Sequence, residues 1–260
     1  MKINNGENLV DHSNIEKTAR ILLNSKYVTA LTGAGVSVES GIRPFRGPGG
    51  LWTERGEPPL NGYQRFLEDP DIYWDNIKKR RQNFPNRKKV NPNPGHYALY
   101  QLEQLGILKT LITQNIDDLH NVAGNKNVIE IHGNSKKMRC ISCGTRWSRE
   151  QYYSDIDSKY CPNCMGIVKG DTVMFGEPIP KDVLDQCFLE AKKTDCMIVA
   201  GTSAVVQPAA SLPLIVKRRG GTLIEVNPMS TEISDYCKVV IRQPSGIFFP
   251  QLINVINKMK

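Results

Sequence analysis

Four of the seven cysteines stand in two closely spaced pairs. Cys140 and Cys143 form one C-x-x-C, Cys161 and Cys164 form a second, and 17 residues separate the two pairs. Each C-x-x-C places two thiolates on one tight turn, and two such turns complete a tetrahedral set of sulfur ligands. Because all four ligands would come from the protein, we predict one structural Zn²⁺ ion with no open position for catalysis.

A glycine-rich stretch, TGAGVSVESGIRPFRG, follows the β-branched run YVTALT and indicates a second kind of chemistry. Such a loop after a strand can hold phosphates with backbone amides. Gly33 and Gly35 fit the first two glycines of the dinucleotide pattern G-x-G-x-x-G, but Val38 stands where the third is required. We also find no acidic residue at a strand end about 20 positions on to hold a ribose. The loop therefore predicts a dinucleotide site unlike that of a dehydrogenase.

Polar segments follow six predicted strands at the point where each strand ends. In chain order these segments are TGAGVS, TQNIDDLH, HGN, FGEP, GTS and NP. In an open parallel sheet, ligands bind in the crevice at the carboxyl ends of the strands. If the strands are parallel, all six loops converge on one crevice.

The elements that must position these loops alternate between helix and strand patterns, which predicts an α/β fold. We expect a Rossmann-like, doubly wound parallel sheet with a small inserted zinc-binding domain. The main domain is predicted over 1–133 and 170–260, with a helical insertion at about 45–92, and the zinc-binding module over 134–169. A capping box, Ser13 to Glu16, predicts the start of the first helix, and TVMF (172–175) is predicted to be a strand.

Composition bounds the class of protein. The 260 residues are 40% hydrophobic with a net charge of +8, and no run approaches the roughly 20 apolar residues of a membrane span. The polar N-terminus lacks the apolar stretch of a signal peptide, so we expect a cytoplasmic protein without disulfides. The basic clusters KKRR, RKK and KRR are either solvated faces or attract acidic partners such as nucleic acid.

The motifs, taken in order, resemble those of the sirtuins, the NAD-dependent protein-lysine deacylases. The resemblance rests on TGAGVSVESGIRPFRG, TQNIDDLHNVAG, IHGN, the four cysteines, FGEPIP, GTSAVVQPAA and VNP, and it runs from about residue 15 to near the C-terminus. It implies that NAD is consumed as a co-substrate. An acyl-lysine would enter between the two domains, and the products would be free lysine, nicotinamide and O-acyl-ADP-ribose.

The resemblance also implies the residue roles. His132 would be the general base for a ribose hydroxyl, a task that suits a pKa of about 6.5. Asn115 and Asp117 would act on the nicotinamide ribose, although such residues alone could be a helix cap. NAD contacts are implied for Gly33, Ala34, Gly35, Ser37, Phe45, Arg46, Gln114, Asn115, Asp117, Gly201, Thr202, Ser203 and Asn227. Peptide contacts are implied for Phe175, Gly176, Glu177, Ala204, Val205 and Val206.

Several alternatives stay open. Desuccinylating sirtuins carry Tyr-x-x-Arg in the acyl pocket, and here Ile77 and Arg80 occupy these positions. Arg80 could bind the carboxylate of a succinyl or malonyl group. The same NAD pocket could serve mono-ADP-ribosyl transfer or NAD glycohydrolysis. The zinc module and the net charge could instead belong to a nucleic-acid-binding protein. The expected partners are acyl-lysine proteins or peptides and, from the charge, acidic or nucleic-acid-associated molecules.

Overall fold

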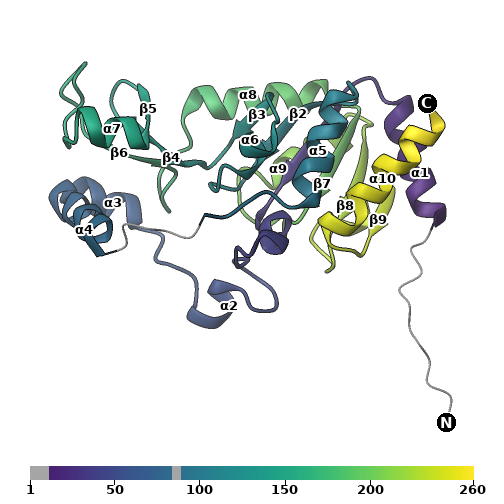
Figure 1. The fold of residues 1–260 in the computed structure, drawn as a ribbon, viewed down its shortest axis with the longest axis horizontal. Coiled ribbons are helices and arrows are strands. Elements are labelled where there is room, and N and C mark those ends of the chain that lie inside the picture. Colours follow the sequence, from purple (N-terminus) through teal and green to yellow (C-terminus); the bar gives the residue numbers. More distant parts are fainter. Residues whose placement is uncertain (1–11, 84–88) are drawn as a thin grey trace, which may run out of the picture.

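A six-stranded parallel sheet forms the centre of the molecule, in the order β3-β2-β1-β7-β8-β9 (Figure 1). The computed structural model describes residues 12–83 and 89–260. The strands of this sheet are β1 Val28–Thr32, β2 Leu108–Thr113, β3 Val128–Glu130, β7 Cys196–Ala200, β8 Thr222–Val226 and β9 Val239–Ile241. The order reverses between β1 and β7, which places the predicted crevice at the carboxyl ends of these two strands.

Helices cover both faces of the sheet, as a doubly wound fold requires. One face carries α1 His12–Asn24, α5 Pro94–Gln104 and α10 Ser245–Met259, and the other carries α8 Lys181–Lys193 and α9 Ser211–Arg218. Side chains of a strand alternate between the two faces. Accordingly Ile198 of β7 belongs to the core under α1, α5 and α10, and Val199 belongs to the core under α8 and α9.

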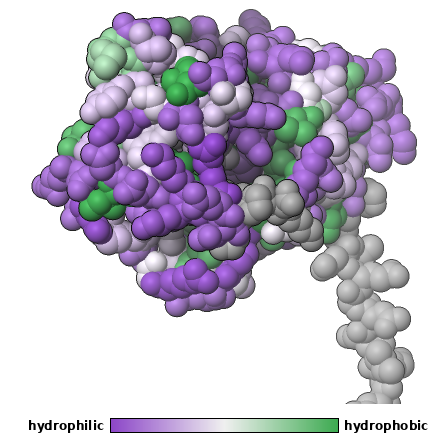
Figure 2. Space-filling model, turned by 60° about the vertical axis from the view of Figure 1, so that its left-hand side comes forward, coloured by the Kyte–Doolittle hydropathy of each residue, from purple (hydrophilic) through white to green (hydrophobic). Residues whose placement is uncertain are grey.

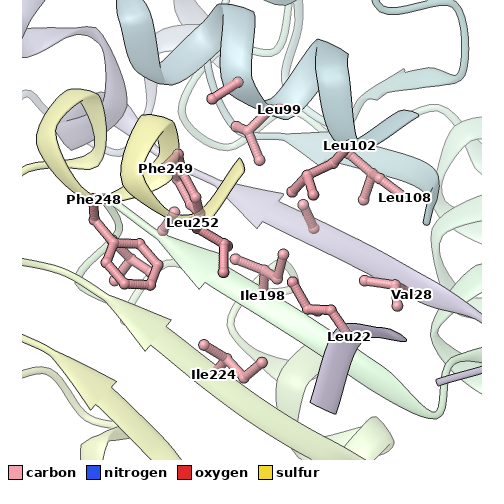
Figure 3. Close-up of a cluster of buried hydrophobic side chains, with 14 of the residues drawn as sticks. Leu22, Val28, Leu99, Leu102, Leu108, Ile198, Ile224, Phe248, Phe249 and Leu252 are labelled. Atoms are coloured by element: carbon pink, nitrogen blue, oxygen red, sulfur yellow. The ribbon is translucent and has the colours of Figure 1, made fainter. Parts of the chain in front are cut away.

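The larger core lies between α5, α10 and the middle of the sheet (Figure 3). Leu99 and Leu102 of α5 and Phe249 of α10 are fully buried above Ile198 and Ile224. Each such side chain contributes roughly 1.5–3 kcal/mol by leaving water. This packing fixes the sheet, and with it the loops at its carboxyl edge.

A second, three-stranded antiparallel sheet holds the four paired cysteines. It consists of β4 Gly133–Cys140, β5 Arg146–Ser148 and β6 Val168–Thr172, with α7 Arg149–Asp155 between β5 and β6. The 3₁₀ helix η1 Ala34–Ser40 follows β1, and three short helices lie in the region predicted as a helical insertion: α2 Leu51–Arg55, α3 Gly62–Glu68 and α4 Pro70–Asn83. Trp74 of α4 is buried against Tyr152 of α7, and its indole Nε1 donates to the carbonyl of Val168 at 2.9 Å. This contact joins α4 to the small sheet.

Two predictions of local structure were wrong. The strand predicted at 172–175 is not found there. The observed strand, β6, ends at Thr172, and it pairs with β4 of the small sheet instead of joining the parallel sheet. The loop FGEP therefore reaches the crevice from the small sheet. Ser13 was predicted to cap the first helix, but it lies inside α1.

The remaining short elements are α6 Leu119–Ala123 and the 3₁₀ helix η2 Ser234–Tyr236. No helix in the described ranges is long and apolar enough to cross a membrane. Figure 2 shows the side that carries the helical insertion and the small sheet. It is mainly hydrophilic, with small separate groups of hydrophobic atoms and a hollow near its centre.

Candidate functional site

The loops that follow β1 and β7 are in direct backbone contact, at the point where the strand order reverses. The N–H of Gly33 donates to Ala200 and that of Gly35 donates to Gly201 at 2.8 Å. A Cβ atom on Gly35 would lie 2.6 Å from the Cα of Gly201, so a side chain there would collide with backbone. In this structure the two glycines are thus required for loop packing, while their contact with a phosphate stays a prediction. Ala34, between them, opens η1.

His132 lies between the two sheets, one residue before β4 begins. Its Nδ1 is 3.2 Å from the carbonyl oxygen of Gln114, at the end of β2. A carbonyl can only accept, so Nδ1 carries the proton and Nε2 is left as the basic nitrogen. Burial lowers the pKa of His132 below 6.5, and the hydrogen bond to Gln114 opposes this in part. The next residue, Gly133, has a φ of 76°, and a Cβ there would lie 1.5 Å from the carbonyl oxygen of Asp171.

Asn115 and Asp117 are held in place by Ser37. The Ser37 hydroxyl donates to Asp117 at 2.7 Å and accepts from the Asn115 side chain at 3.1 Å. Asn115 also donates to the carbonyl of Gly33, which links the end of β2 to the glycine loop. Ser37 is fully buried, so donation from its hydroxyl to NAD, with which a contact is predicted, would require the hydroxyl to leave Asp117.

Two further histidines lie directly behind this cluster. The rings of His96 and His120 are 4.8 Å apart, and His96 lies 3.4 Å from the Ser37 hydroxyl. Burial lowers the pKa of His96 to about 4, although Asp117 opposes the shift. Burial, together with His96, lowers the pKa of His120 well below 6.5. Both rings are therefore neutral at neutral pH and can support Ser37 without adding charge.

The other end of the crevice is built on β7 and β8. The hydroxyl of Thr202 accepts a hydrogen bond from the side chain of Gln114 at 2.9 Å. The backbone carbonyl of Thr202 accepts one from the side chain of Asn227, also at 2.9 Å. Arg242 donates to the carbonyl of Asn227 and to the carboxylate of Glu225, which is 1% exposed near the carboxyl end of β8. A continuous series of hydrogen bonds therefore runs from β8 to His132.

The loop between η1 and α2 carries Phe45 and Arg46. Phe45 is 40% exposed and packs on Trp52 with the ring centroids 4.6 Å apart. Arg46 lies over the same indole and pairs with Glu57. Trp52 in turn contacts Phe175 of the loop after β6. This series of rings joins the loop expected at the NAD site to the loop expected at the peptide.

An ion network holds the loop after β6. Glu177 pairs with both Arg139 and Lys169, and Arg139 also pairs with Asp171. The four side chains are at most 8% exposed, and burial lowers the pKa of Lys169 while Glu177 opposes this. Glu177 also accepts from the N–H of Met174 at 2.8 Å. The carboxylate of Glu177 thus fixes the loop after β6, which is predicted to contact the peptide, to the small sheet.

The backbone groups expected to meet a peptide lie on both sides of the crevice. On the small-sheet side Gly176 is exposed, whereas the carbonyl of Phe175 already accepts from Tyr63. On the β7 side Val205 is 48% exposed and Ala204 has a φ of 55°, an uncommon value for a residue with a side chain. The half-buried residues of that side are Ser203 and Val206.

The four paired cysteines form one cluster. The Sγ atoms of Cys140 and Cys164 are 3.5 Å apart, those of Cys143 and Cys161 are 3.7 Å apart, and all four lie within 4.8 Å of one another. A tetrahedron with Zn–S bonds of about 2.3 Å has its sulfurs roughly 3.8 Å apart. The residues therefore fit a structural Zn²⁺ ion, as the spacing predicted. The remaining cysteines pack in the cores under the helices.

Arg80 and Ile77 lie on the same side of α4, one helical turn apart. Arg80 is exposed and Ile77 is half-buried. The neighbouring Arg81 is engaged, because it pairs with Asp157 and lies over the ring of Tyr153. No ion pair to Arg80 is found within the described residues, so its guanidinium can serve a carboxylate.

Sequence reasoning missed three features of this site: the ring of Trp52, the network around Lys169, and Arg242. Trp52, Lys169 and Arg242 lie in none of the motifs, although Glu177 of the network belongs to FGEPIP. A tryptophan beside a glycine-rich loop and a lysine inside a strand were the available signals. Their partners are far apart in sequence, so spacing alone could not pair them.

Comparison with known proteins identifies relatives of the chain. The model of the Sir2 family matches residues 33–208. NAD-dependent protein deacylase 1 of Archaeoglobus fulgidus is 44% identical over 243 residues, 94% of this chain and 98% of that protein. A solved Sir2 homologue–NAD complex matches with a TM-score of 0.78 at 44% identity, covering 94% of each chain. A Sir2 structure with a p53 peptide and NAD⁺ has a TM-score of 0.76 at 32% identity, covering 95% of this chain and 99% of that one.

Proposed function

This chain belongs to the Sir2 family, and from that premise we propose that it removes acyl groups, most simply acetyl groups, from protein lysine with consumption of NAD. One observation carries this proposal. His132 presents a basic nitrogen beside Gln114, which leads directly into Asn115 and Asp117, at the edge where the two sheets meet. Mass spectrometry of an acetyl-lysine peptide, with and without NAD, tests it. Loss of the acetyl mass only with NAD is expected.

The polar side chains of the crevice divide the work. When bound, NAD supplies a ribose whose anomeric carbon loses nicotinamide. We assign Gln114, Asn115 and Asp117 to that half of the molecule, and Thr202 and Asn227 to the adenosine half. His132 Nε2 takes a proton from a ribose hydroxyl, because Nδ1 is already committed to the Gln114 carbonyl.

The acyl-lysine peptide is expected to bind as an extended strand between the two loops that face each other across the crevice. Gly176 and Val205 are both exposed, one on each loop, and this supports the placement. Strand addition reads backbone more than side chains. The enzyme should therefore accept many sequences around the lysine.

We also propose the division into a main domain, 1–133 and 170–260, and a zinc module, 134–169, with the peptide between them.

The pH dependence follows from the burial of His132. The general base must be neutral, and burial lowers its pKa below 6.5. Lowering the pH protonates the base only when the pH passes that lowered pKa. We expect kcat/KM for an acetyl peptide to stay level from pH 8 to about 6.5 and to fall below it. A fall with a midpoint clearly above pH 6.5 would contradict the role of His132.

Removal of acidic acyl groups is the second candidate, and the free guanidinium of Arg80 favours it. Arg80→Ala is expected to lower kcat/KM for a succinyl-lysine peptide about tenfold or more, because a charge-assisted pair is lost. Turnover of the acetyl peptide gives the internal reference. Lys79→Ala, which removes a neighbouring exposed charge, is the matched control. Equal turnover of succinyl peptide by Arg80→Ala and Lys79→Ala would exclude the acidic pocket.

The same experiments separate the remaining alternatives. Gain of an ADP-ribose mass on the peptide would indicate mono-ADP-ribosyl transfer, and nicotinamide release without peptide change would indicate glycohydrolysis.

We propose a cytoplasmic location. Support comes from the cysteines, which are all free thiols in the described part of the chain, four of them in the zinc cluster.

A further inference from the structure

A row of basic side chains lines the amino ends of all six strands of the parallel sheet, opposite the crevice. For each strand, one exposed lysine or arginine is either among the first two residues of the strand or in the segment that leads into it. In sheet order these residues are Lys126, Lys109, Lys26, Lys193, Arg219 and Lys238, before or in β3, β2, β1, β7, β8 and β9.

Five further basic residues stand in the last turns of the helices that end at this edge, or just after them. The Nζ of Lys260 lies 3.2 Å from the carbonyl of Leu105, which places the end of α10 beside the entry to β2. All five are exposed: Lys192, Lys217, Arg218, Lys258 and Lys260. We call these eleven residues the amino-end rim.

The acidic residues near the amino-end rim leave its charge largely unbalanced. Glu103 accepts from backbone N–H groups of Lys126 and Asn127, and Asp195 accepts from those of Lys26 and Tyr27. Buried Glu190 accepts hydrogen bonds from the hydroxyls of Tyr27 and Thr110. Its ion pair with Lys193 is the single ion pair of a rim residue within the described part of the chain. Lys109 and Lys260 donate to backbone carbonyls, and among the described residues only Lys193 has a carboxylate partner, so most of the rim's charge is exposed without an ion pair.

Helix dipoles explain only part of this pattern. Basic residues at the carboxyl ends of α8, α9 and α10 stabilise these helices through the helix dipole. Lys26 and Lys126 also follow helix ends, those of α1 and α6, but Lys109 lies inside β2 and Lys238 directly before β9, more than four residues beyond any α-helix. The charge at these two strands thus needs another cause.

We propose that the amino-end rim binds the phosphate backbone of duplex nucleic acid without reading its sequence. Six strands about 4.8 Å apart give a row roughly 24 Å long, which matches about seven base pairs at 3.4 Å each. Surface lysines and arginines supply this kind of affinity through counterion release.

An anionic membrane fits the amino-end rim less well. Helices that lie on membranes insert apolar side chains between the headgroups. Among the described residues, Tyr236 is the one large exposed hydrophobic side chain within two positions of a rim residue. The rim offers charge without an apolar anchor.

The crevice stays open when the rim is occupied. The substrate loops lie at the carboxyl ends of the same strands, and the small sheet lies at the end of the molecule far from the C-terminus in Figure 1. With nucleic acid on the rim, the crevice would therefore face away from the duplex and stay accessible to an acyl-lysine substrate.

The test is fluorescence anisotropy of the full chain with a labelled 24-base-pair duplex between 50 and 200 mM NaCl. Arg218→Glu/Arg219→Glu removes two rim charges, and Lys78→Glu/Lys79→Glu on α4 makes the same change of net charge away from the rim. We expect the rim variant to bind at least tenfold more weakly at 50 mM. Its salt slope should be smaller by about 1.8, because each lost phosphate contact removes about 0.9. The α4 variant should stay within threefold of the unchanged chain.

Three outcomes would overturn the proposal: no binding at 50 mM NaCl, equal weakening in both variants, or binding to phosphatidylserine vesicles without binding to the duplex. Lys126→Glu/Lys238→Glu, at the two edges of the sheet, provides a second rim variant. Deacylation of an acetyl peptide shows that each variant is folded, and it should be unchanged. The binding result does not depend on that activity, so the two proposals fail separately.

Discussion

Replacing His132 with alanine is expected to slow deacylation by about 10²–10⁴-fold, the usual contribution of one general base. Alanine removes the one imidazole that reaches the edge between the two sheets, and nothing in the described residues replaces its Nε2. His96 and His120 cannot substitute, because both are buried behind Ser37. The rate is measured as peptide deacetylation at saturating NAD.

The same variant should still bind NAD, because Gln114, Asn115 and Thr202 keep their hydrogen bonds without the imidazole. Protection by NAD against thermal unfolding measures this. Loss of activity with intact protection places the defect in the proton transfer. A variant that keeps the unchanged rate would refute the assignment of the base.

Replacing Cys161 with serine is expected to remove the zinc ion and, with it, most of the activity. Cys161 is fully buried among the small-sheet residues, and a structural site binds zinc with roughly 10–16 kcal/mol of apparent free energy. That is as large as the whole stability of a typical domain, about 5–15 kcal/mol. The small sheet should therefore lose its fixed structure. Because β4 starts one residue after His132, the base would lose its position as well.

Native mass spectrometry gives the zinc content, and thermal unfolding gives the stability. Cys237→Ser is the matched control, since Cys237 is half-buried outside the cluster and its Sγ already contacts the carbonyl of Ile233. The control should keep one zinc ion and full activity. A zinc-free Cys161→Ser enzyme with full activity would show that the small sheet holds its shape without metal.

The sequence was sufficient for the parts of the molecule that depend on local spacing. The two C-x-x-C pairs predicted the sulfur cluster, and the alternation of helix and strand predicted the parallel sheet. The placement of polar segments after strands predicted that Gly33, Gln114, Gly201 and Asn227 would meet. These inferences work because a parallel sheet brings the carboxyl ends of its strands to one edge.

Other features depend on pairing between distant segments. Val168–Thr172 reads VKGDT, a composition poor in strand-forming residues, and its pairing with β4 makes it a strand of the small sheet. Lys169 and Glu177 look like surface charges, yet both are buried because Arg139 and Asp171 complete the network. Burial of a charge is acceptable only with such partners, and no local pattern records them.

The strand order also decides when this protein can begin to fold during synthesis. β1 lies between β2 and β7, and Val28 pairs on one side with Leu108 and on the other with Cys196. The middle of the sheet is therefore incomplete until about three-quarters of the chain has left the ribosome, at roughly 5–20 residues per second. Until then β1, whose five residues are all buried in the complete sheet, keeps one edge unpaired, which favours association between chains. A nascent or truncated chain that ends before Cys196 should aggregate or depend on a chaperone, even though it already contains the zinc ligands and His132.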